Sequence, residues 1–411
     1  MKVTELILKN FRGIESLELR NLDAHCNVIV GINGAGKTTV LDALAYLLSW
    51  QLARLKSGTG KGTAILNTDI NLKAKESSIS MRIDNNLGWS LCKQRAYSGK
   101  KIQIGCQTNL SELMLWVEDV LKEGNNGGSV PVIMYYPVER AIASAPVNLH
   151  KGTEPVIWDV YKGALSGNAN FRSFFEWYRR QEDVENECIR DDRDYQDKSL
   201  KAIREAMQIF FPEFNGLRVR RRPYQALVVE KGIEVIEFTQ LSQGEKCYLS
   251  LICDIARRLA MANPNSANPL CGKGIVLIDE VDLHLHPKWQ SEIVAKLTEV
   301  FPNCQFIMST HSPHVLSDLR REQIIPLDNG ILQEISFNPY GQLTSSILTN
   351  YFGVKAQRNG IVAANIEAAF QAIADNNREE YLRLFEQLKD TVGVADRDVV
   401  NLMIEAKRKG L

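Results

Sequence analysis

The chain has no excess of charge of either sign. Its 49 lysine and arginine residues balance 49 aspartate and glutamate residues, so the formal net charge is zero. A protein without net charge has no global attraction to nucleic acid, and any contact with DNA must use a local basic patch. Composition alone therefore gives no electrostatic footprint of a nucleic-acid binder.

Cysteine pairs and long apolar runs are also missing. The eight cysteines contain no CxxC pair and lie largely in apolar runs such as residues 249–253, which is typical of reduced thiols in a cytoplasm. No apolar run approaches the ~20 residues needed to span a bilayer. Residues 1–8 are too charged and too short for a signal peptide. We therefore expect a cytoplasmic protein with no membrane partner.

The chain is long enough for several lobes. With 411 residues, of which 45% are hydrophobic, it can bury a substantial core. We expect an α/β fold with a mixed central sheet, an antiparallel β subdomain, a short helical insertion and a helical C-terminal tail. The expected regions are an N-terminal lobe (1–150), the insertion (151–215), a C-terminal lobe (216–327) and the helical tail (328–411).

A glycine-rich loop is the most informative feature present. Residues 31–39 (GINGAGKTT) follow an apolar strand-like run, the second of two strands expected in residues 1–50, and open a helix. This is the context of a phosphate-binding P-loop, in which backbone N–H groups surround the phosphates of a nucleoside triphosphate such as ATP. Lys37 supplies a charge to the phosphates and Thr38 a ligand for Mg²⁺. The predicted cradle consists of Asn33, Gly34, Ala35, Gly36, Lys37, Thr38 and Thr39.

Two downstream strands end in residues suited to hydrolysis. Residues 275–280 (IVLIDE) read as a buried central strand that ends in two acids. Asp279 is placed to hold the Mg²⁺ shell, and Glu280 to orient or deprotonate a water. Residues 305–312 form a second apolar strand, and His311 at its end is a candidate contact to the γ-phosphate. Lys37, Glu280 and His311 are therefore the predicted catalytic residues.

A second anion site precedes another helix. Residues 241–246 (LSQGEK) lead into a helix over residues 247–260, so Ser242 and the helix N-terminus can bind an anion. Ser242 and the Lys37 loop cannot both sit at one phosphate if each begins a separate helix of one compact sheet. A second copy of the chain must then bring them together, and an isologous interface closes two sites at once.

These pieces, in this order, resemble the ABC-type ATPase superfamily. Lys37 lies in a Walker A loop, Ser242, Gln243, Gly244 and Glu245 resemble a variant of the LSGGQ signature, Asp279 and Glu280 match Walker B, and His311 matches the switch histidine. The resemblance implies a head-to-tail homodimer, or a higher oligomer, that sandwiches ATP and Mg²⁺. Gln243 and Glu245 depart from the usual signature, so turnover is expected to be slow.

Within the superfamily the chain resembles the SMC, RecF and OLD-like branch. Residues 6–14, 280–287 and 309–313 carry this likeness. It implies that Arg12 lies near the nucleotide phosphates, although a surface arginine is the alternative. His284 and His286 resemble a D-loop that contacts the partner subunit, and no Cys or carboxylate cluster completes a zinc site around them. Two candidates remain open for the Q-loop, Gln94 and residues 135–140.

The middle of the chain is too short for a long coiled-coil arm. Residues 171–190 and 192–210 read as two helices of a few turns, since a helix advances about 1.5 Å per residue. A compact lid or docking surface fits better. The basic run 218–222 has two open interpretations: contact with a phosphate backbone, or a charged strand edge that discourages aggregation.

The tail reads as helices over residues 345–352, 359–374, 378–390 and 395–409, with no nuclease signature. A small head without arms resembles the ATPase subunits of the Septu anti-phage systems, called PtuA, which also occur with some retrons. That resemblance implies a separate HNH nuclease as partner, DNA contacted directly or through the complex, and in some systems a retron reverse transcriptase with its RNA–DNA product. The alternatives are a RecF-like repair ATPase and a nucleotide-sensing scaffold with little turnover.

Overall fold

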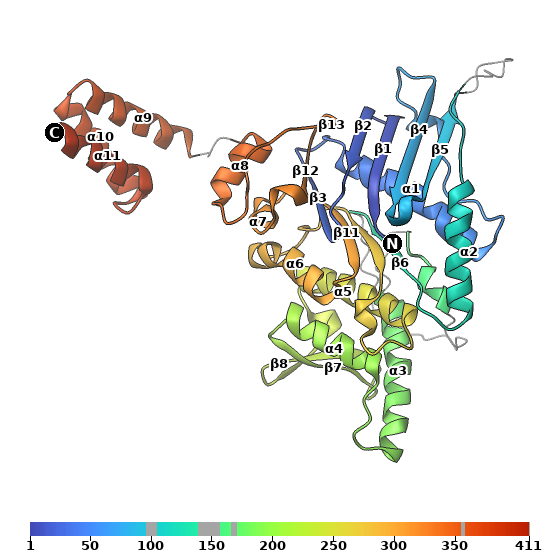
Figure 1. Cartoon of the computed structure of the whole chain (residues 1–411). Coiled ribbons are helices and arrows are strands. Elements are labelled where there is room, and N and C mark those ends of the chain that lie inside the picture. Colours follow the sequence, from blue (N-terminus) through green and yellow to red (C-terminus); the bar gives the residue numbers. More distant parts are fainter. Residues whose placement is uncertain (96–104, 139–156, 166–170, 355–357, 411) are drawn as a thin grey trace. The chain divides into compact units, whose positions relative to one another are not determined.

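The computed structural model describes residues 1–95, 105–138, 157–165, 171–354 and 358–410, and these form two compact units (Figure 1). The first unit spans Met1–Ile347 and the second Leu348–Leu411. The predicted α/β class with a mixed central sheet is confirmed in the first unit, and the predicted helical tail supplies the second.

A six-stranded sheet forms the centre of the first unit. The strands, in the order in which they pair, are β13 (Ile331–Leu332), β12 (Ile324–Asp328), β3 (Cys26–Val30), β11 (Cys304–Thr310), β10 (Gly274–Ile278) and β6 (Val132–Tyr136). All neighbours are parallel except β12 and β13. Every residue of β3, β6, β10 and β11 is buried, as expected for strands covered on both faces. The carboxyl ends of β3, β10 and β11 therefore lie at one edge.

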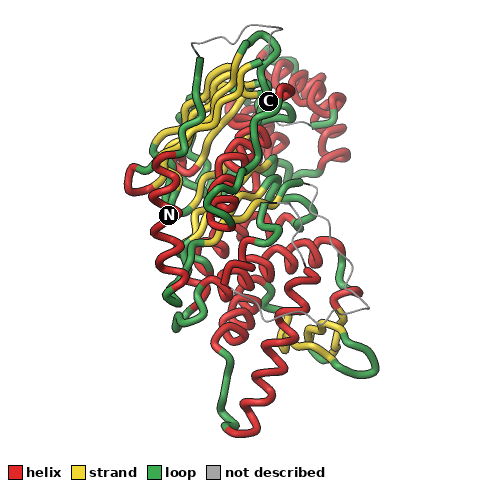
Figure 2. The backbone as a smooth tube through the Cα atoms, turned by 90° about the vertical axis from the view of Figure 1, so that its right-hand side faces the viewer, coloured by secondary structure: helices red, strands yellow, loops and turns green. Residues whose placement is uncertain are grey.

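A four-stranded antiparallel sheet supplies the predicted β subdomain. Its strands pair in the order β2 (Ile14–Arg20), β1 (Val3–Phe11), β4 (Glu76–Ile83) and β5 (Gly88–Gln94), and Figure 2 shows them running side by side. The expectation of two strands before the P-loop is wrong, because β1, β2 and β3 all precede it. A tight turn at Arg12, whose φ is 51°, folds the first apolar stretch back on itself and makes two strands of it.

The helices of the first unit cover the strands or extend from them. They are α1 (Lys37–Lys56), α2 (Ser111–Asn125), α3 (Phe171–Asp191), α4 (Lys198–Phe210), α5 (Gln243–Ala262), α6 (Pro287–Val300), α7 (Pro313–Leu316) and α8 (Thr344–Phe352), which crosses the unit boundary. Among the helices that the structure describes, none combines the length and apolar character needed to cross a bilayer.

The two helices predicted for the insertion are present as α3 and α4. The second starts later than predicted, at Lys198, because the Asp197 side chain caps the helix by accepting the Leu200 N–H at 2.9 Å. A three-stranded sheet in the order β7 (Phe214–Arg220), β8 (Ala226–Lys231) and β9 (Glu234–Glu237) follows α4.

The basic run lies at the end of β7, an edge strand, and faces acids. Arg218 lies 3.7 Å from Glu230, Arg220 pairs with Glu237, and Arg221 contacts Glu182 at 2.5 Å. These carboxylates neutralise three of the guanidinium groups that a nucleic-acid backbone would need. The geometry favours the charged-edge interpretation of residues 218–222 over phosphate contact.

The second unit contains three helices with their own core. They are α9 (Gly360–Ala374), α10 (Arg378–Val392) and α11 (Arg397–Lys409), each within two residues of its predicted start and end. The core is formed by side chains at helical spacing, among them Ile366, Leu384 and Leu402.

Candidate functional site

The P-loop connects β3 to α1 and leaves the start of that helix open. The N-cap residue is Gly36, in the left-handed conformation at φ 101°, and no side chain caps the helix. Gly34, also at positive φ, has open space where a Cβ would point. Lys37 bends back so that its ammonium donates to the carbonyls of Gly31 at 3.0 Å and Ile32 at 3.2 Å. Burial lowers the pKa of Lys37, and the nearby acids only partly oppose this.

The β12–β13 hairpin packs against the P-loop. Gly330 N–H donates to the Ala35 carbonyl at 2.9 Å. A Cβ on Gly31 would lie 2.2 Å from the Leu327 carbonyl oxygen, so only glycine allows this close approach. The loop is thus held from a segment about 300 residues later in the sequence.

Asp279 lies at the end of β10 and joins the P-loop to the neighbouring strand. Its Oδ2 accepts the Thr38 hydroxyl at 2.7 Å, and its Oδ1 accepts the Ser309 hydroxyl. The aspartate is fully buried, which fixes its position. A hydroxyl and a carboxylate oxygen side by side are the donor set that Mg²⁺ prefers beside phosphates.

Glu280 and His311 follow the two central strands and face each other. Glu280 adopts φ 45°, and its N–H donates to the Ser309 hydroxyl at 2.8 Å. The His311 Nε2 atom lies 3.9 Å from Glu280 Oε1. Burial, and next the positive charge of Lys37, lower the pKa of His311. The imidazole is therefore neutral at pH 7 in the free chain.

One cavity of about 210 Å³ collects most of the predicted site. It is lined by Asn33, Gly34, Gly36, Lys37, Thr38, Thr39, Glu280 and His311. Backbone donors, a lysine, a Thr–Asp oxygen pair and a carboxylate at one open cradle fit a magnesium-bound triphosphate. Ala35 is buried beneath the loop rather than lining the cavity.

The signature turn does not line this cavity. Ser242 is the N-cap of α5, and its hydroxyl accepts the Glu245 N–H at 3.3 Å while Glu245 Oε2 accepts the Ser242 N–H at 2.8 Å. Gln243 is the first residue of the helix. A Cβ on Gly244 would lie 2.4 Å from the His284 carbonyl oxygen, so the turn packs against the segment after Walker B.

A buried ionic cluster anchors α5. Asp254 accepts hydrogen bonds from Arg257 at 2.7 Å, Arg258 at 2.9 Å and the Tyr136 hydroxyl at 2.8 Å. Burial by itself would raise the pKa of Asp254, but Arg258 and Arg257 outweigh it and lower that pKa to about 2. The Tyr136 carbonyl also accepts the Asp279 N–H at 2.8 Å, so one tyrosine touches both the Walker B end and α5.

Arg12 is held by acids of its own chain. Its Nε donates to Asp69 at 2.9 Å and its Nη1 to Asp42, a residue of α1. The Tyr135 hydroxyl donates to the other Asp42 oxygen at 2.8 Å. These contacts place Arg12 beside the P-loop helix, and contact with phosphate stays a prediction.

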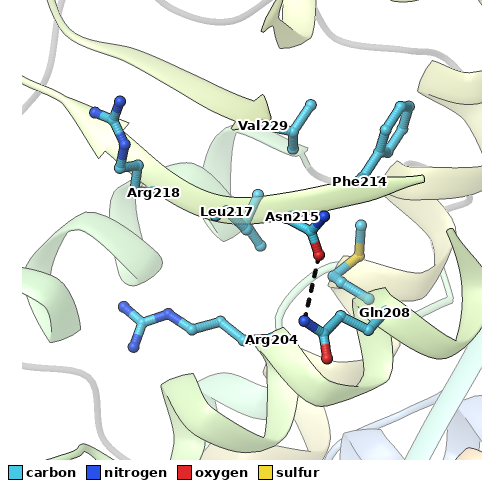
Figure 3. Close-up of a pocket in the computed structure, with 9 residues that line it drawn as sticks. Arg204, Gln208, Phe214, Asn215, Leu217, Arg218 and Val229 are labelled. Atoms are coloured by element: carbon cyan, nitrogen blue, oxygen red, sulfur yellow. Dashed lines mark hydrogen bonds between the residues drawn. The ribbon is translucent and has the colours of Figure 1, made fainter. Parts of the chain in front are cut away.

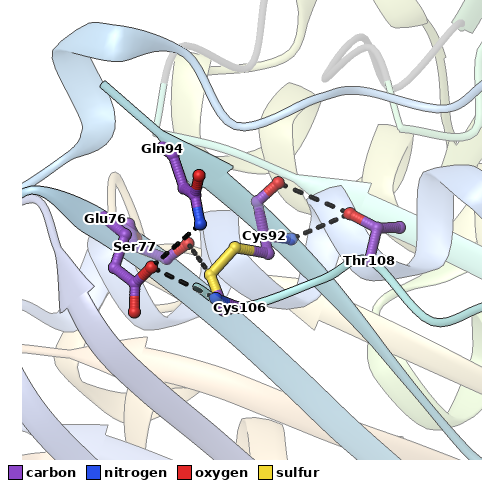
Figure 4. The surroundings of a disulfide bond; sticks show 6 residues. All are labelled: Glu76, Ser77, Cys92, Gln94, Cys106 and Thr108. Atoms are coloured by element: carbon purple, nitrogen blue, oxygen red, sulfur yellow. Dashed lines mark hydrogen bonds between the residues drawn. A yellow bond between two sulfur atoms is a disulfide. The ribbon is translucent and has the colours of Figure 1, made fainter. Parts of the chain in front are cut away.

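The two Q-loop candidates lie at different places. Gln94 ends β5, and its amide donates to Glu76 at 3.2 Å, an interaction within the antiparallel sheet (Figure 4). Tyr135 and Tyr136 end β6, directly beside β10. The last two residues of that candidate, 139 and 140, lie outside the described residues.

The expectation of reduced cysteines is wrong for one pair. A disulfide joins Cys92 on β5 to Cys106, and Figure 4 shows Thr108 hydrogen bonded to Cys92 beside it. The chain returns along β5 before α2, where Ser90 and Asn109 exchange backbone hydrogen bonds at 2.9 Å. This pairing brings together cysteines that no sequence spacing relates.

The histidines after Walker B have different local roles. His286 caps α6, with its Nδ1 accepting the Lys288 N–H at 3.2 Å, and His284 adopts φ 64°. In the described part of the chain, no group of three His, Cys, Asp or Glu side chains could hold a metal ion.

Sequence reasoning missed two residues that organise the site. Ser309 contacts both Walker B acids, and Asp282 accepts the His311 N–H at 3.4 Å and the Thr310 hydroxyl. The available signal for Ser309 was a serine near the end of a buried apolar strand, two residues before His311. The second is visible only when β10 and β11 are known to be neighbours.

Comparison with known proteins agrees with this geometry. A family model described as "AAA domain" matches residues 5–214, and a second, described as "AAA domain, putative AbiEii toxin, Type IV TA system", matches residues 154–317. The chain is 29% identical to the "Retron Ec83 probable ATPase" of Escherichia coli, with 100% of this chain and 87% of that protein covered. It is 22% identical to the "Septu protein PtuA" of Bacillus thuringiensis, with 94% and 93% covered.

Among solved structures, the SMC head domain from Thermotoga maritima is 14% identical, with a TM-score of 0.43, and covers 82% of this chain and 100% of that one. The first family model spans half of the chain and includes the P-loop. The chain therefore belongs to the AAA-domain family of P-loop ATPases.

Proposed function

We propose that the chain is the ATP-hydrolysing subunit of an anti-phage defence complex, and that two copies close head to tail around two ATP molecules. One observation carries this proposal: Lys37, Glu280 and His311 line one cavity, whereas Ser242 is not among its lining residues. A second copy can supply the missing turn. The similarity to proteins named retron ATPases and Septu PtuA supports the defence role.

The chain's own residues divide the chemistry among them. Lys37 and the open N-terminus of α1 bind the phosphates, and Glu280 accepts a proton from the attacking water. His311, neutral in the free chain, is placed to hydrogen bond a phosphate oxygen near Glu280. Thr38 and Asp279 would hold Mg²⁺, which neutralises charge on the phosphates. The altered signature, with Gln243 and Glu245, supports slow turnover.

The partner of this ATPase is proposed to be a separate HNH nuclease that acts on DNA. The ion-paired arginines Arg218, Arg220 and Arg221 support contact with DNA through the complex rather than through this chain alone. In retron-associated systems, a reverse transcriptase and its RNA–DNA product would be further partners. We place the complex in the cytoplasm.

Hydrolysis tests the catalytic assignment. We expect Lys37→Ala and Glu280→Gln each to lower kcat by about 10²-fold or more, because the first removes the charge on the phosphates and the second removes the group that accepts a proton from the water. Lys122→Ala, on the exposed face of α2, is the matched control and should keep the wild-type rate. Equal phosphate release by all four proteins would contradict the proposed function.

Assembly tests the dimer separately. Glu280→Gln keeps the phosphate cradle, so it should retain ATP and show twice the monomer mass by light scattering, whereas Lys37→Ala should stay monomeric. A Glu280→Gln protein that binds ATP without any increase in mass would rule out the head-to-tail pair. Co-expression with an HNH nuclease should then yield a complex whose DNA cleavage changes between these two variants.

A further inference from the structure

The signature turn, residues 241–246, contains its own negatively charged group, the Glu245 carboxylate. The Glu245 carboxylate lies at the N-terminus of α5, where its Oε2 accepts the Ser242 N–H at 2.8 Å. Its other oxygen, Oε1, lies 3.3 Å from the Lys231 ammonium. A carboxylate held by a backbone N–H and a lysine occupies the position and chemistry that a phosphate oxygen would need.

Lys231 reaches this turn from a different element. It is the last residue of β8, where it pairs with Phe214 of β7, and its ammonium lies 5.3 Å from the Phe214 ring centre. Phe214 in turn lines a cavity of about 330 Å³ between α4 and β7 (Figure 3). The aromatic ring and the strand therefore hold the lysine beside the signature turn before any ligand arrives.

The negative charge of Glu245 lets it compete with a phosphate for Lys231 and the Ser242 N–H. Burial would raise its pKa, but hydrogen bonds from the Ser242 N–H and the ion pair to Lys231 outweigh burial and lower it. Glu245 is therefore an anion at neutral pH. A more highly charged phosphate that approached Ser242 would replace the carboxylate and leave Lys231 facing the new anion.

We propose that Lys231 is a phosphate-binding residue of the signature side, covered by Glu245 until the γ-phosphate held by a second copy displaces that carboxylate. This inference rests on the proposed head-to-tail dimer. It adds a cation that belongs to no recognised motif. It also means that the Glu245–Lys231 ion pair must break before ATP can join the two copies.

The surroundings of Lys231 support contact with a second copy. Ile233, at the tip of the same hairpin, is 102% exposed, and Val235 is 47% exposed. Exposed apolar side chains in and directly after the turn that follows Lys231 favour association with another surface that covers them. A second copy that brought its triphosphate to Ser242 would approach this hairpin.

ATP-dependent dimerisation of variants made in the Glu280→Gln protein tests the role of Lys231. The readout is the ATP concentration at half-maximal dimer, determined by light scattering. Glu245→Gln keeps the cap and removes the competing charge, so it should lower this midpoint about threefold to tenfold. Lys231→Ala should raise it about tenfold, and Lys231→Arg, which keeps the charge, should stay near the parent. Glu118→Gln and Lys122→Ala, both on the exposed face of α2, are the charge-matched controls.

The outcomes separate the two proposals. If the Glu280→Gln parent forms no dimer with ATP, the proposed function fails. If the parent dimerises but Lys231→Ala has the parent's midpoint, the inference is overturned. It is also overturned if Glu245→Gln and Lys231→Ala both raise the midpoint, because the pair then only stabilises the turn. Thermal unfolding of each variant confirms that the fold is intact.

Discussion

Helices α1 and α5 both present the positive end of a helix dipole, but only α5 has a side-chain cap at its N-terminus. Helix α1 begins after Gly36 with no side-chain cap, whereas α5 begins at Ser242 with a complete capping box closed by Glu245. Backbone N–H groups at a helix start attract anions in either case. The backbone donors at the start of α1 are therefore open to a phosphate, while those at the start of α5 are already satisfied by Ser242 and Glu245.

The largest expected effect concerns the anchoring of the capped helix. Asp254→Asn leaves Arg257 and Arg258 buried without a carboxylate, so we expect the free energy of unfolding to fall by about 3–5 kcal/mol. Urea unfolding measures the loss. Glu15→Gln, which breaks the exposed pair with Lys73, is the control and should cost less than about 1 kcal/mol. Similar small losses in both variants would refute the anchoring role of the cluster.

A smaller effect is expected from filling space at the signature turn. Gly244→Ala places a methyl group 2.4 Å from the His284 carbonyl oxygen, and a shift of the turn should cost about 1–3 kcal/mol. ATP binding to the monomer should persist, because α1 is untouched, while ATP-dependent dimerisation weakens. Gly13→Ala, with no atom within 4 Å of the new methyl group, is the matched control. Equal loss of monomer binding would mean that the two helix ends are not independent.

The smallest expected effect is the uptake of a fraction of one proton by His311 when an ATP analogue binds. Since burial and Lys37 lower the pKa of His311, the ring is neutral at pH 7, and the negative charge of a γ-phosphate beside it should raise that pKa and draw a proton in. Binding enthalpies of an ATP analogue measured in buffers of different ionisation heat report this uptake. It should grow from pH 8 to pH 7 and vanish in His311→Ala. Unchanged uptake in that variant would assign the proton elsewhere.

Much of the site could be predicted because local patterns determine it. Residues 31–39 must lie between a strand and a helix, and buried apolar strands ending in Asp279 and His311 must place those residues at one edge of a parallel sheet. Chain order and strand direction therefore sufficed to gather the residues around one cavity.

The remainder depends on contacts between distant segments. Arg12 meets Asp42 and Asp69, 30 and 57 residues away, and no periodicity encodes such a choice of partner. The Cys92–Cys106 pair follows from a short backbone pairing between Ser90 and Asn109. Capping of the signature by Glu245 is visible as an S-x-x-E pattern, but its ion pair with Lys231 requires the β8 strand to end beside α5.

Tyr136 gives the molecule a continuous path of hydrogen bonds between α1, which follows the P-loop, and α5, which follows the signature turn. The Thr38 hydroxyl of α1 binds Asp279, the Asp279 N–H binds the Tyr136 carbonyl, and the Tyr136 hydroxyl binds Asp254 of α5. In a symmetric pair, such a path runs through each subunit from the nucleotide it grips to the nucleotide it covers. In the proposed pair, Tyr136 would therefore link the residues that hold one nucleotide to the helix that faces the other.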